Sequence, residues 1–127
     1  MATMKQKILL IEDDAFIASL MIGTLKLAGF DVNSASDGET GLKKLEKEIP
    51  DIILLDLILP GIHGFELLKK LKETDRTKEI PVIIVSNLGS QEEIKKGLKL
   101  GADAYLIKAH ILPVDLVKKI KEILGKK

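Results

Sequence analysis

Short runs of apolar, often β-branched residues alternate five times along this chain with longer segments that have helical spacing. Most of the runs are continuously apolar, which is typical of strands covered on both faces. The second run is the most polar, as expected of a strand at the edge of a sheet. Strands that alternate with helices predict a parallel sheet with helices on both faces, which is an α/β fold. The predicted strands are Lys7–Ile11, Asp31–Ala35, Asp51–Leu55, Pro81–Val85 and Ala104–Ile107.

Sequence signals mark the ends of several of the predicted helices. Asp14 stands where an N-cap belongs, and Gly29 stands where a glycine commonly ends a helix. Ser90 precedes Glu93 by three residues, the spacing of a capping box, and Pro113 is tolerated in the first turn of a helix. We therefore predict five helices: Asp14–Leu27, Gly38–Glu48, Gly64–Glu73, Ser90–Leu100 and Pro113–Leu124.

The length and composition fit one globular domain over residues 1–127, of which 46% are hydrophobic and 31% charged. Lys plus Arg number 20 and Asp plus Glu 19, so no bulk charge favours nucleic acid or an anionic membrane. No stretch reaches the roughly 18 apolar residues of a membrane span. Cysteine is absent, which fits a reducing compartment. We expect a cytoplasmic protein that starts naturally at Met4, with Met1–Thr3 as an added or disordered extension.

Polar side chains stand at the carboxyl ends of four predicted strands. Glu12 and Asp13 follow the first strand, Asp56 the third, Ser86 the fourth and Lys108 the fifth. Because these ends lie on one edge of a parallel sheet, where ligands bind, the five side chains should converge in one crevice. Asp56 interrupts the apolar stretch DIILLDLILPGIHG. An unpaired buried charge is costly, so Asp56 needs a partner there.

Three carboxylates in one crevice repel one another more than one lysine can neutralise. Either some pKa values rise or a cation binds. Hard oxygen ligands with open positions suit Mg²⁺. An aspartate beside Mg²⁺ and a lysine can attack a phosphoryl group and become an aspartyl phosphate, while metal and amine offset the charge on the transferring oxygens. The residues thus predict a magnesium-dependent phosphoacceptor, with Asp56 as the acceptor and the metal as its partner.

With these residues in place, the chain resembles the receiver domain of two-component response regulators over essentially its full length. The matching segments are ILLIEDD, DIILLDLILPGIHGFELL, PVIIVSN and GADAYLIK, in the order and spacing of that family. The resemblance implies a flavodoxin-like, doubly wound fold with strand order 2-1-3-4-5. It also implies a signalling switch that takes a phosphoryl group from a partner histidine onto Asp56, and not an enzyme that acts on a separate substrate.

The resemblance assigns the metal ligands. Glu12 and Asp13 would be the acidic pair, with Asp13 the more direct Mg²⁺ ligand and Glu12 acting partly through water. Asp56 would be both acceptor and ligand, and the backbone carbonyl of Ile58 would be a further protein ligand.

The resemblance also assigns a switch and its partners. Ser86 would bind the phosphoryl group, Tyr105 would be the switch aromatic and Lys108 the conserved amine of the family. The donor would be a sensor histidine kinase or a histidine phosphotransfer protein. A downstream protein would dock on the fourth helix, fifth strand and fifth helix, and the chain would be a monomer or a phosphorylation-dependent dimer. The lysines of the last two helices otherwise form a solvated face (Lys95, Lys96, Lys99, Lys118, Lys119 and Lys121).

Three features depart from the family pattern. Ala109 follows the lysine where the family usually has proline, often on a cis bond, so the isomer of the Lys108–Ala109 bond stays open. Ile58 and Leu88 occupy the variable positions that flank the acceptor and the hydroxyl. Neither side chain orients an attacking water, so we expect slow self-dephosphorylation. We also expect no output domain, because the sequence stops after the last helix.

Other functions fit the residues less well. A flavin carrier shares the fold, but its first loop must cradle a phosphate, and the loop EDD repels one. A metal-dependent phosphatase usually has a second acid two residues after its nucleophile, where this chain has Ile58. A phosphorylation-independent interaction module of the same fold is the main alternative, although no acid and no lysine of the site is lost. His63 and His110 are expected to be solvated loop histidines and not ligands.

Overall fold

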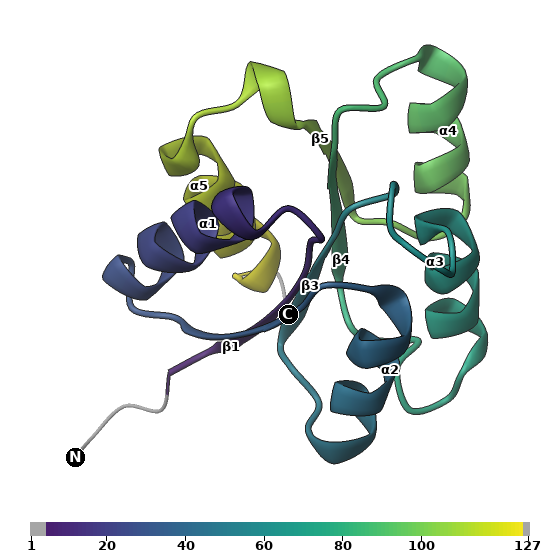
Figure 1. The fold of residues 1–127 in the computed structure, drawn as a ribbon, viewed down its shortest axis with the longest axis horizontal. Helices are drawn as coiled ribbons and strands as arrows, with labels where there is room; N and C mark the ends of the chain where they lie inside the picture. Colours follow the sequence, from purple (N-terminus) through teal and green to yellow (C-terminus); the bar gives the residue numbers. More distant parts are fainter. Residues whose placement is uncertain (1–4, 126–127) are drawn as a thin grey trace.

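A parallel sheet lies between two layers of helices in the computed structural model, which describes residues 5–125 (Figure 1). The expected extension Met1–Thr3 lies outside that range. Within it, five strands pair in the order β2-β1-β3-β4-β5, and every pairing is parallel, which confirms the predicted order. The strands are β1 (Lys7–Ile11), β2 (Asp31–Ala35), β3 (Ile52–Leu55), β4 (Val82–Ser86) and β5 (Ala104–Ile107).

Two helices cover one face of the sheet and three cover the other (Figure 1). The first face carries α1 (Ala15–Leu27) and α5 (Pro113–Leu124), and the second carries α2 (Gly38–Lys47), α3 (Gly64–Glu73) and α4 (Gln91–Lys99). A short 3₁₀ helix, η1 (Lys108–His110), follows β5. No helix of residues 5–125 is both long and apolar enough to cross a membrane.

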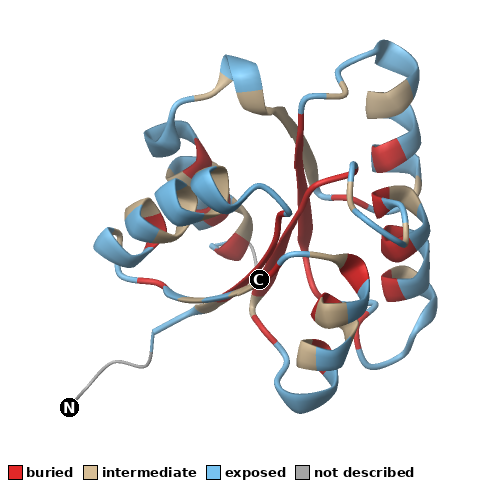
Figure 2. Cartoon of the chain, viewed as in Figure 1, coloured by how far each residue is buried: buried red, intermediate tan, exposed pale blue. Residues whose placement is uncertain are grey.

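The core consists of two apolar clusters separated by the sheet. Along β1, Leu9 and Ile11 pack on the side of α2 to α4, whereas Ile8 and Leu10 pack on the side of α1 and α5. β3 and β4 are buried throughout, as Figure 2 shows in red, and this explains their continuously apolar sequences. β2 is partly exposed, as an edge strand should be. Each fully buried Leu or Ile contributes about 1.5–3 kcal/mol, so these strands fix the sheet on which the site depends.

Most predicted helix ends agree with the structure. The Asp14 side chain accepts a hydrogen bond from the Ile17 amide, which confirms it as the N-cap of α1. Ser90 and Glu93 form the expected capping box at α4. Gly29 has a φ of 98°, which explains the glycine after α1.

Three strand boundaries differ by one residue from the prediction. The third strand begins at Ile52, after Asp51. The fourth begins at Val82, after Pro81, and extends to Ser86. Ser86 is therefore the last residue of β4, in register with Ile107, and does not follow the strand.

Candidate functional site

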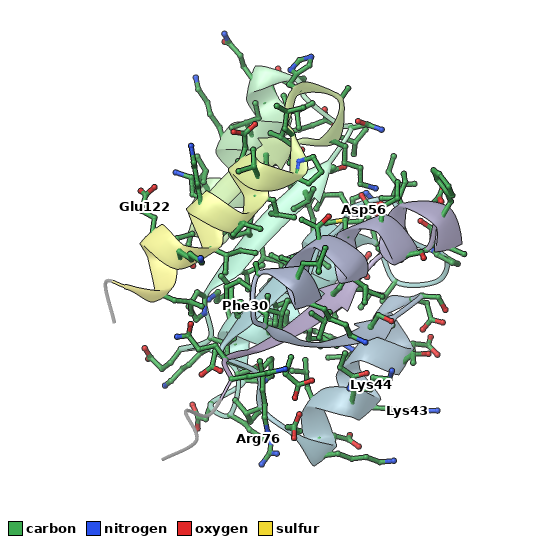
Figure 3. The ribbon with its side chains drawn as sticks, turned by 90° about the vertical axis from the view of Figure 1, so that its left-hand side faces the viewer. Phe30, Lys43, Lys44, Asp56, Arg76 and Glu122 are labelled. Atoms are coloured by element: carbon green, nitrogen blue, oxygen red, sulfur yellow. The ribbon has the colours of Figure 1, made fainter. Side chains whose placement is uncertain are left out.

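The carboxyl ends of β1, β3 and β5 bring three charged residues together. Glu12 and Asp56 directly follow the paired residues Ile11 and Leu55. The Asp56 amide donates a hydrogen bond to the Ile11 carbonyl at 3.0 Å, which continues the hydrogen-bond ladder between β1 and β3 as far as Asp56. Asp56 lies at the same end of the molecule as the start of α1 (Figure 3). Parallel pairing thus brings Glu12, Asp56 and Lys108 to one edge of the sheet, as the sequence predicts for these three residues.

Lys108 joins the two acids. Its ammonium lies 2.9 Å from Asp56 Oδ2 and also forms an ion pair with Glu12 Oε1. All three side chains are largely shielded from solvent, with exposed fractions of 14% for Lys108, 7% for Asp56 and 2% for Glu12. Charge-assisted hydrogen bonds in such surroundings are strong. Asp56 needs a charge partner in its apolar stretch, and in this structure that partner is Lys108.

Backbone amides fix the other side of the Asp56 carboxylate. Asp56 Oδ1 accepts a hydrogen bond from the Leu57 amide at 2.7 Å and lies 3.4 Å from the Ile58 amide. The Gly64 amide donates to the Leu57 carbonyl at 2.9 Å and so ties the loop after β3 to the start of α3. The loop and the lysine together hold the carboxylate in one orientation.

Burial and neighbouring charges shift the pKa values of Glu12 and Lys108 in opposite directions. Burial raises the pKa of Glu12, although hydrogen bonds from Lys108 and from the Asp14 amide oppose the increase. Burial lowers the pKa of Lys108, but hydrogen bonds to Glu12 and Asp56 and their negative charges outweigh it, so the pKa of Lys108 is raised. The ammonium therefore stays protonated throughout the neutral range.

Asp13 completes an acidic group that fits a metal ion. It is exposed, and one carboxylate oxygen from each of Glu12, Asp13 and Asp56 lies within 4.8 Å of the other two. That spacing is near the roughly 4 Å between oxygens on opposite sides of one Mg²⁺ ion. All the donors are oxygens, which suits a hard cation. The predicted role of the Ile58 carbonyl as a further ligand stays a prediction.

Ser86 and Tyr105 are linked through the backbone of Leu88. The buried Ser86 Oγ accepts a hydrogen bond from the Leu88 amide at 3.2 Å. The Tyr105 hydroxyl donates to the Leu88 carbonyl. Burial, with smaller contributions from the charges of Glu93 and Asp56, raises the pKa of Tyr105 to about 12. The sequence drew attention to Leu88 only for its side chain and did not show this link.

The backbone after Lys108 is hydrogen-bonded to Asn87, the residue that follows β4. The Ala109 amide donates to Asn87 Oδ1 at 3.1 Å. The Lys108–Ala109 bond is trans, since residues 5–125 contain no cis peptide. Ala109 and His110 lie in η1, which the sequence did not predict.

His63 has a structural role that the sequence did not reveal. Its Nδ1 accepts a hydrogen bond from the Phe65 amide at 3.1 Å, so His63 is the N-cap of α3. Its ring also packs on that of Phe65, with centroids 5.4 Å apart. His110 is exposed, and neither histidine belongs to the acidic group. Histidine is an uncommon cap, so no local signal pointed to this one.

Comparisons with known proteins agree on one family. The model of the response regulator receiver domain matches residues 8–121. The phosphate regulon transcriptional regulatory protein PhoB of Escherichia coli K12 is 36% identical over 121 residues, which are 95% of this chain and 52% of that protein. The chain thus spans about half the length of this curated relative.

Solved structures match nearly the whole chain. A response regulator from Chloroflexus aurantiacus superimposes with a TM-score of 0.90 at 32% identity, over 96% of this chain and 99% of that one. A CheY-like receiver domain protein from Methanospirillum hungatei gives 0.89 at 34% identity, over 97% and 96%.

Proposed function

This chain belongs to the response regulator receiver domain family, and from that premise we propose that it is the phosphoacceptor switch of a two-component phosphorelay. In this proposal the receiver domain spans residues 1–127, and Asp56 accepts a phosphoryl group from a histidine of a partner protein. One observation carries the proposal. Asp56 is oriented by Lys108 and by the Leu57 amide, beside two further carboxylates at the ligand-binding edge of the sheet.

Glu12, Asp13, Asp56 and the Ile58 carbonyl would hold a Mg²⁺ ion. Bound there, the ion would supply positive charge next to the phosphoryl oxygens. Asp13 is the exposed member of the group and so the most accessible to a hydrated cation. One carboxylate oxygen of Glu12 already pairs with Lys108, which fits a residue that binds the metal through water.

In the transfer step the Asp56 carboxylate is the acceptor and an imidazole of the donor protein is the leaving group. An Asp56 oxygen forms a bond to phosphorus while the bond between phosphorus and the donor's ring nitrogen breaks. The imidazole keeps that electron pair and takes up a proton from solvent. Lys108, held 2.9 Å from Asp56 Oδ2, offsets the negative charge that the phosphoryl group brings.

The switch would act through Leu88. Phosphorylation adds negative charge and acceptor oxygens beside Ser86. When the Ser86 hydroxyl turns to the phosphoryl group, its bond with the Leu88 amide is lost. Tyr105 bonds to the carbonyl of the same residue, so a shift of the freed Leu88 backbone would release the Tyr105 hydroxyl and let the ring move. A downstream protein would read the resulting change on α4, β5 and α5.

The partners follow from this role. A sensor histidine kinase or a histidine phosphotransfer protein would donate the phosphoryl group in the cytoplasm. A downstream protein would bind the altered surface, on a monomer or on a phosphorylation-dependent dimer. The domain catalyses its own phosphorylation and slow dephosphorylation and turns over no other substrate.

Incubation with acetyl phosphate and Mg²⁺, followed by intact mass spectrometry, tests the proposal. The wild-type chain should gain one phosphoryl adduct, and Asp56→Asn should gain none. Asp75→Asn is a matched control, because the Asp75 side chain is 96% exposed and pairs with Lys78, away from the site. It should be phosphorylated like the wild type. An unmodified wild type would instead favour an interaction module that works without phosphorylation.

A further inference from the structure

A side-chain hydrogen bond joins β4 to β5 beyond the point where their ladder ends. The last pair of the two strands is Ser86 with Ile107. One residue further along the chain from β4, Asn87 Oδ1 accepts a hydrogen bond from the Ala109 amide at 3.1 Å. The segment that contains Lys108 is thereby tied to the segment that contains Ser86. These two segments supply the amine and the hydroxyl of the site.

The short helix that begins with Lys108 has no cap from its own N-terminal neighbour. This helix, η1, is three residues long, and its N-cap residue Ile107 makes no side-chain hydrogen bond to it. The first amides of a helix lack acceptors within the helix, so they need acceptors from elsewhere. Asn87 supplies one from the end of a neighbouring strand, to the second residue of η1. A proline, which the family usually has at position 109, carries no amide hydrogen and could not use this acceptor.

Two further contacts hold the loop that carries Asn87 against β5. The Leu88 carbonyl accepts a hydrogen bond from the Tyr105 hydroxyl. Gly89 lies against the side chain of Ile107, since a Cβ added at Gly89 would come within 2.8 Å of Ile107 Cδ1. Successive residues of the loop thus each contact the segment from β5 to η1. The loop is fixed at this edge of the sheet, so the Asn87 side chain stays where the amide after Lys108 can reach it.

We propose that Asn87 is a positioning residue for Lys108 and acts through the amide of Ala109. This inference rests on the phosphoacceptor role proposed for Asp56. Two carboxylates hold the ammonium of Lys108, and the bond from Asn87 holds the backbone directly after it. A free lysine side chain has many rotamers, and fixing it at both ends restricts them. The ammonium then faces the incoming phosphoryl group without a further loss of conformational entropy.

Asn87→Ala is the first variant to test. Asn87 is exposed, so it contributes little to the core, and its loss should disturb Lys108 more than the fold. One net hydrogen bond corresponds to a factor of about two to ten in a rate or an equilibrium constant. Phosphorylation at saturating acetyl phosphate and Mg²⁺ should slow by that factor. The Kd for Mg²⁺ should not change, because Asn87 is not among the proposed ligands.

Asn33→Ala is the matched control. Asn33 is the other asparagine of the chain, it is exposed, and its Oδ1 accepts a hydrogen bond from the Ser34 amide at 3.0 Å. It lies on β2, at the edge of the sheet opposite to β5. Because it also loses a bond from Lys44, this variant should lower the midpoint of denaturant unfolding at least as much as Asn87→Ala. It should nevertheless be phosphorylated like the wild type, and equal rates for the two variants would overturn the proposal.

A double-mutant cycle tests whether Asn87 acts through Ala109. Ala109→Pro removes the donor. If the bond carries the effect, Asn87→Ala should not slow phosphorylation any further in the Ala109→Pro background, and additive effects would contradict this path. Hydrogen exchange of the Ala109 amide, followed by NMR, needs no proline variant. Exchange should be faster in Asn87→Ala than in the wild type and in Asn33→Ala, and equal exchange in all three would show that the bond does not hold this amide.

Lysine labelling separates this inference from the proposed function, because it needs no phosphorylation. Brief acetylation in metal-free buffer, followed by peptide mass spectrometry, reports how often the Lys108 ammonium leaves its carboxylates. Relative to the exposed Lys78, labelling of Lys108 should be faster in Asn87→Ala than in the wild type or in Asn33→Ala. If the wild type takes up no phosphoryl group, the proposed function fails and the labelling still decides whether Asn87 positions Lys108. A phosphorylated wild type, with Lys108 labelled equally in all three proteins, would overturn the positioning role alone.

Discussion

The Lys108 ammonium lies 2.9 Å from Asp56 Oδ2, a contact between residues 52 positions apart in the sequence. The same ammonium pairs with Glu12, so one positive charge faces two buried negative ones. Asp13 adds a third carboxylate at the edge of this group. The site is therefore negative overall even with Lys108 in place, and it favours both a divalent cation and a group that arrives with one.

Lys108→Met should strongly destabilise the protein. Removing one partner of a buried ion pair typically costs about 3–5 kcal/mol, because the other charge stays buried and unpaired. Here two carboxylates lose their counter-ion. Denaturant unfolding in metal-free buffer measures the change in the free energy of unfolding.

A control and a rescue sharpen this test. Lys78→Met removes an exposed pair with Asp75 and should cost less than about 1 kcal/mol. Mg²⁺ at ten times its Kd adds about 1.4 kcal/mol to a folded protein that binds it. The gain at a fixed Mg²⁺ concentration should be larger in Lys108→Met than in the wild type, because the uncompensated acids bind the cation more tightly. Similar losses for both variants would show that Lys108 is not energetically coupled to the acids.

Tyr105 gives a clean optical titration, because the chain has one tyrosine and no tryptophan. Burial raises the pKa of Tyr105 to about 12, above the ordinary value of 10.0. In the folded state the phenol thus keeps its proton after the unfolded chain has lost it. Its contribution to stability is complete below pH 10 and is lost as the pH rises through about 12. Phenolate absorbance should titrate later in the folded protein than in denaturant, and coincident curves would contradict the half-buried, hydrogen-bonded position.

Topology rules account for what the sequence could predict. Once strands and helices alternate, the carboxyl ends of parallel strands must share an edge, so the convergence of Glu12, Asp56 and Lys108 follows from their positions after strands. Asp14 and Ser90 were equally accessible to prediction, because a cap depends on one short side chain and the next few amides.

Other contacts of the site cannot be predicted from the residue types in the sequence. The link from Ser86 to Tyr105 uses the amide and carbonyl of Leu88, groups that every residue except proline carries. The capping by His63 depends on a ring orientation set by its contact with Phe65. The ion pair between Lys108 and Glu12 depends on how far β5 lies from β1 at this edge, which strand order alone does not give.

Replacement of Ile58 by asparagine should shorten the lifetime of the phosphoryl group. Ile58 is 54% exposed, two residues after Asp56, and its side chain has no polar atom to orient a water molecule. A positioned polar group typically accelerates such a step by about a hundredfold or more, and a neutral amide should give a smaller, about tenfold, effect. Intact mass at intervals after removal of acetyl phosphate gives the lifetime. Ile58→Val should match the wild type, and a wild-type lifetime of only seconds would refute the expectation of slow hydrolysis.

Gly64→Ala should damage both stability and phosphorylation. A Cβ at Gly64 would lie 2.6 Å from the Asp56 carbonyl oxygen and even closer to the Leu57 Cα, and these backbone atoms cannot rotate aside. Overpacking of this kind costs about 1–3 kcal/mol. Because Asp56 precedes the displaced loop, its carboxylate would also leave the position that Leu57 and Lys108 define, so phosphorylation by acetyl phosphate should slow.

Gly23→Ala is the matched control for this substitution. It adds the same methyl group to a helix, but at a position where a Cβ meets nothing within 4 Å. At low protein concentration it should raise the free energy of unfolding, by up to about 1 kcal/mol, because alanine is the better helix former. Opposite signs for the two variants would locate the damage in the contact between α3 and the loop after β3. If the Gly64→Ala protein is as stable and as readily phosphorylated as the wild type, the loop after β3 can move to accommodate the methyl group. The hydrogen bond from Gly64 to Leu57 would then not set the position of Asp56.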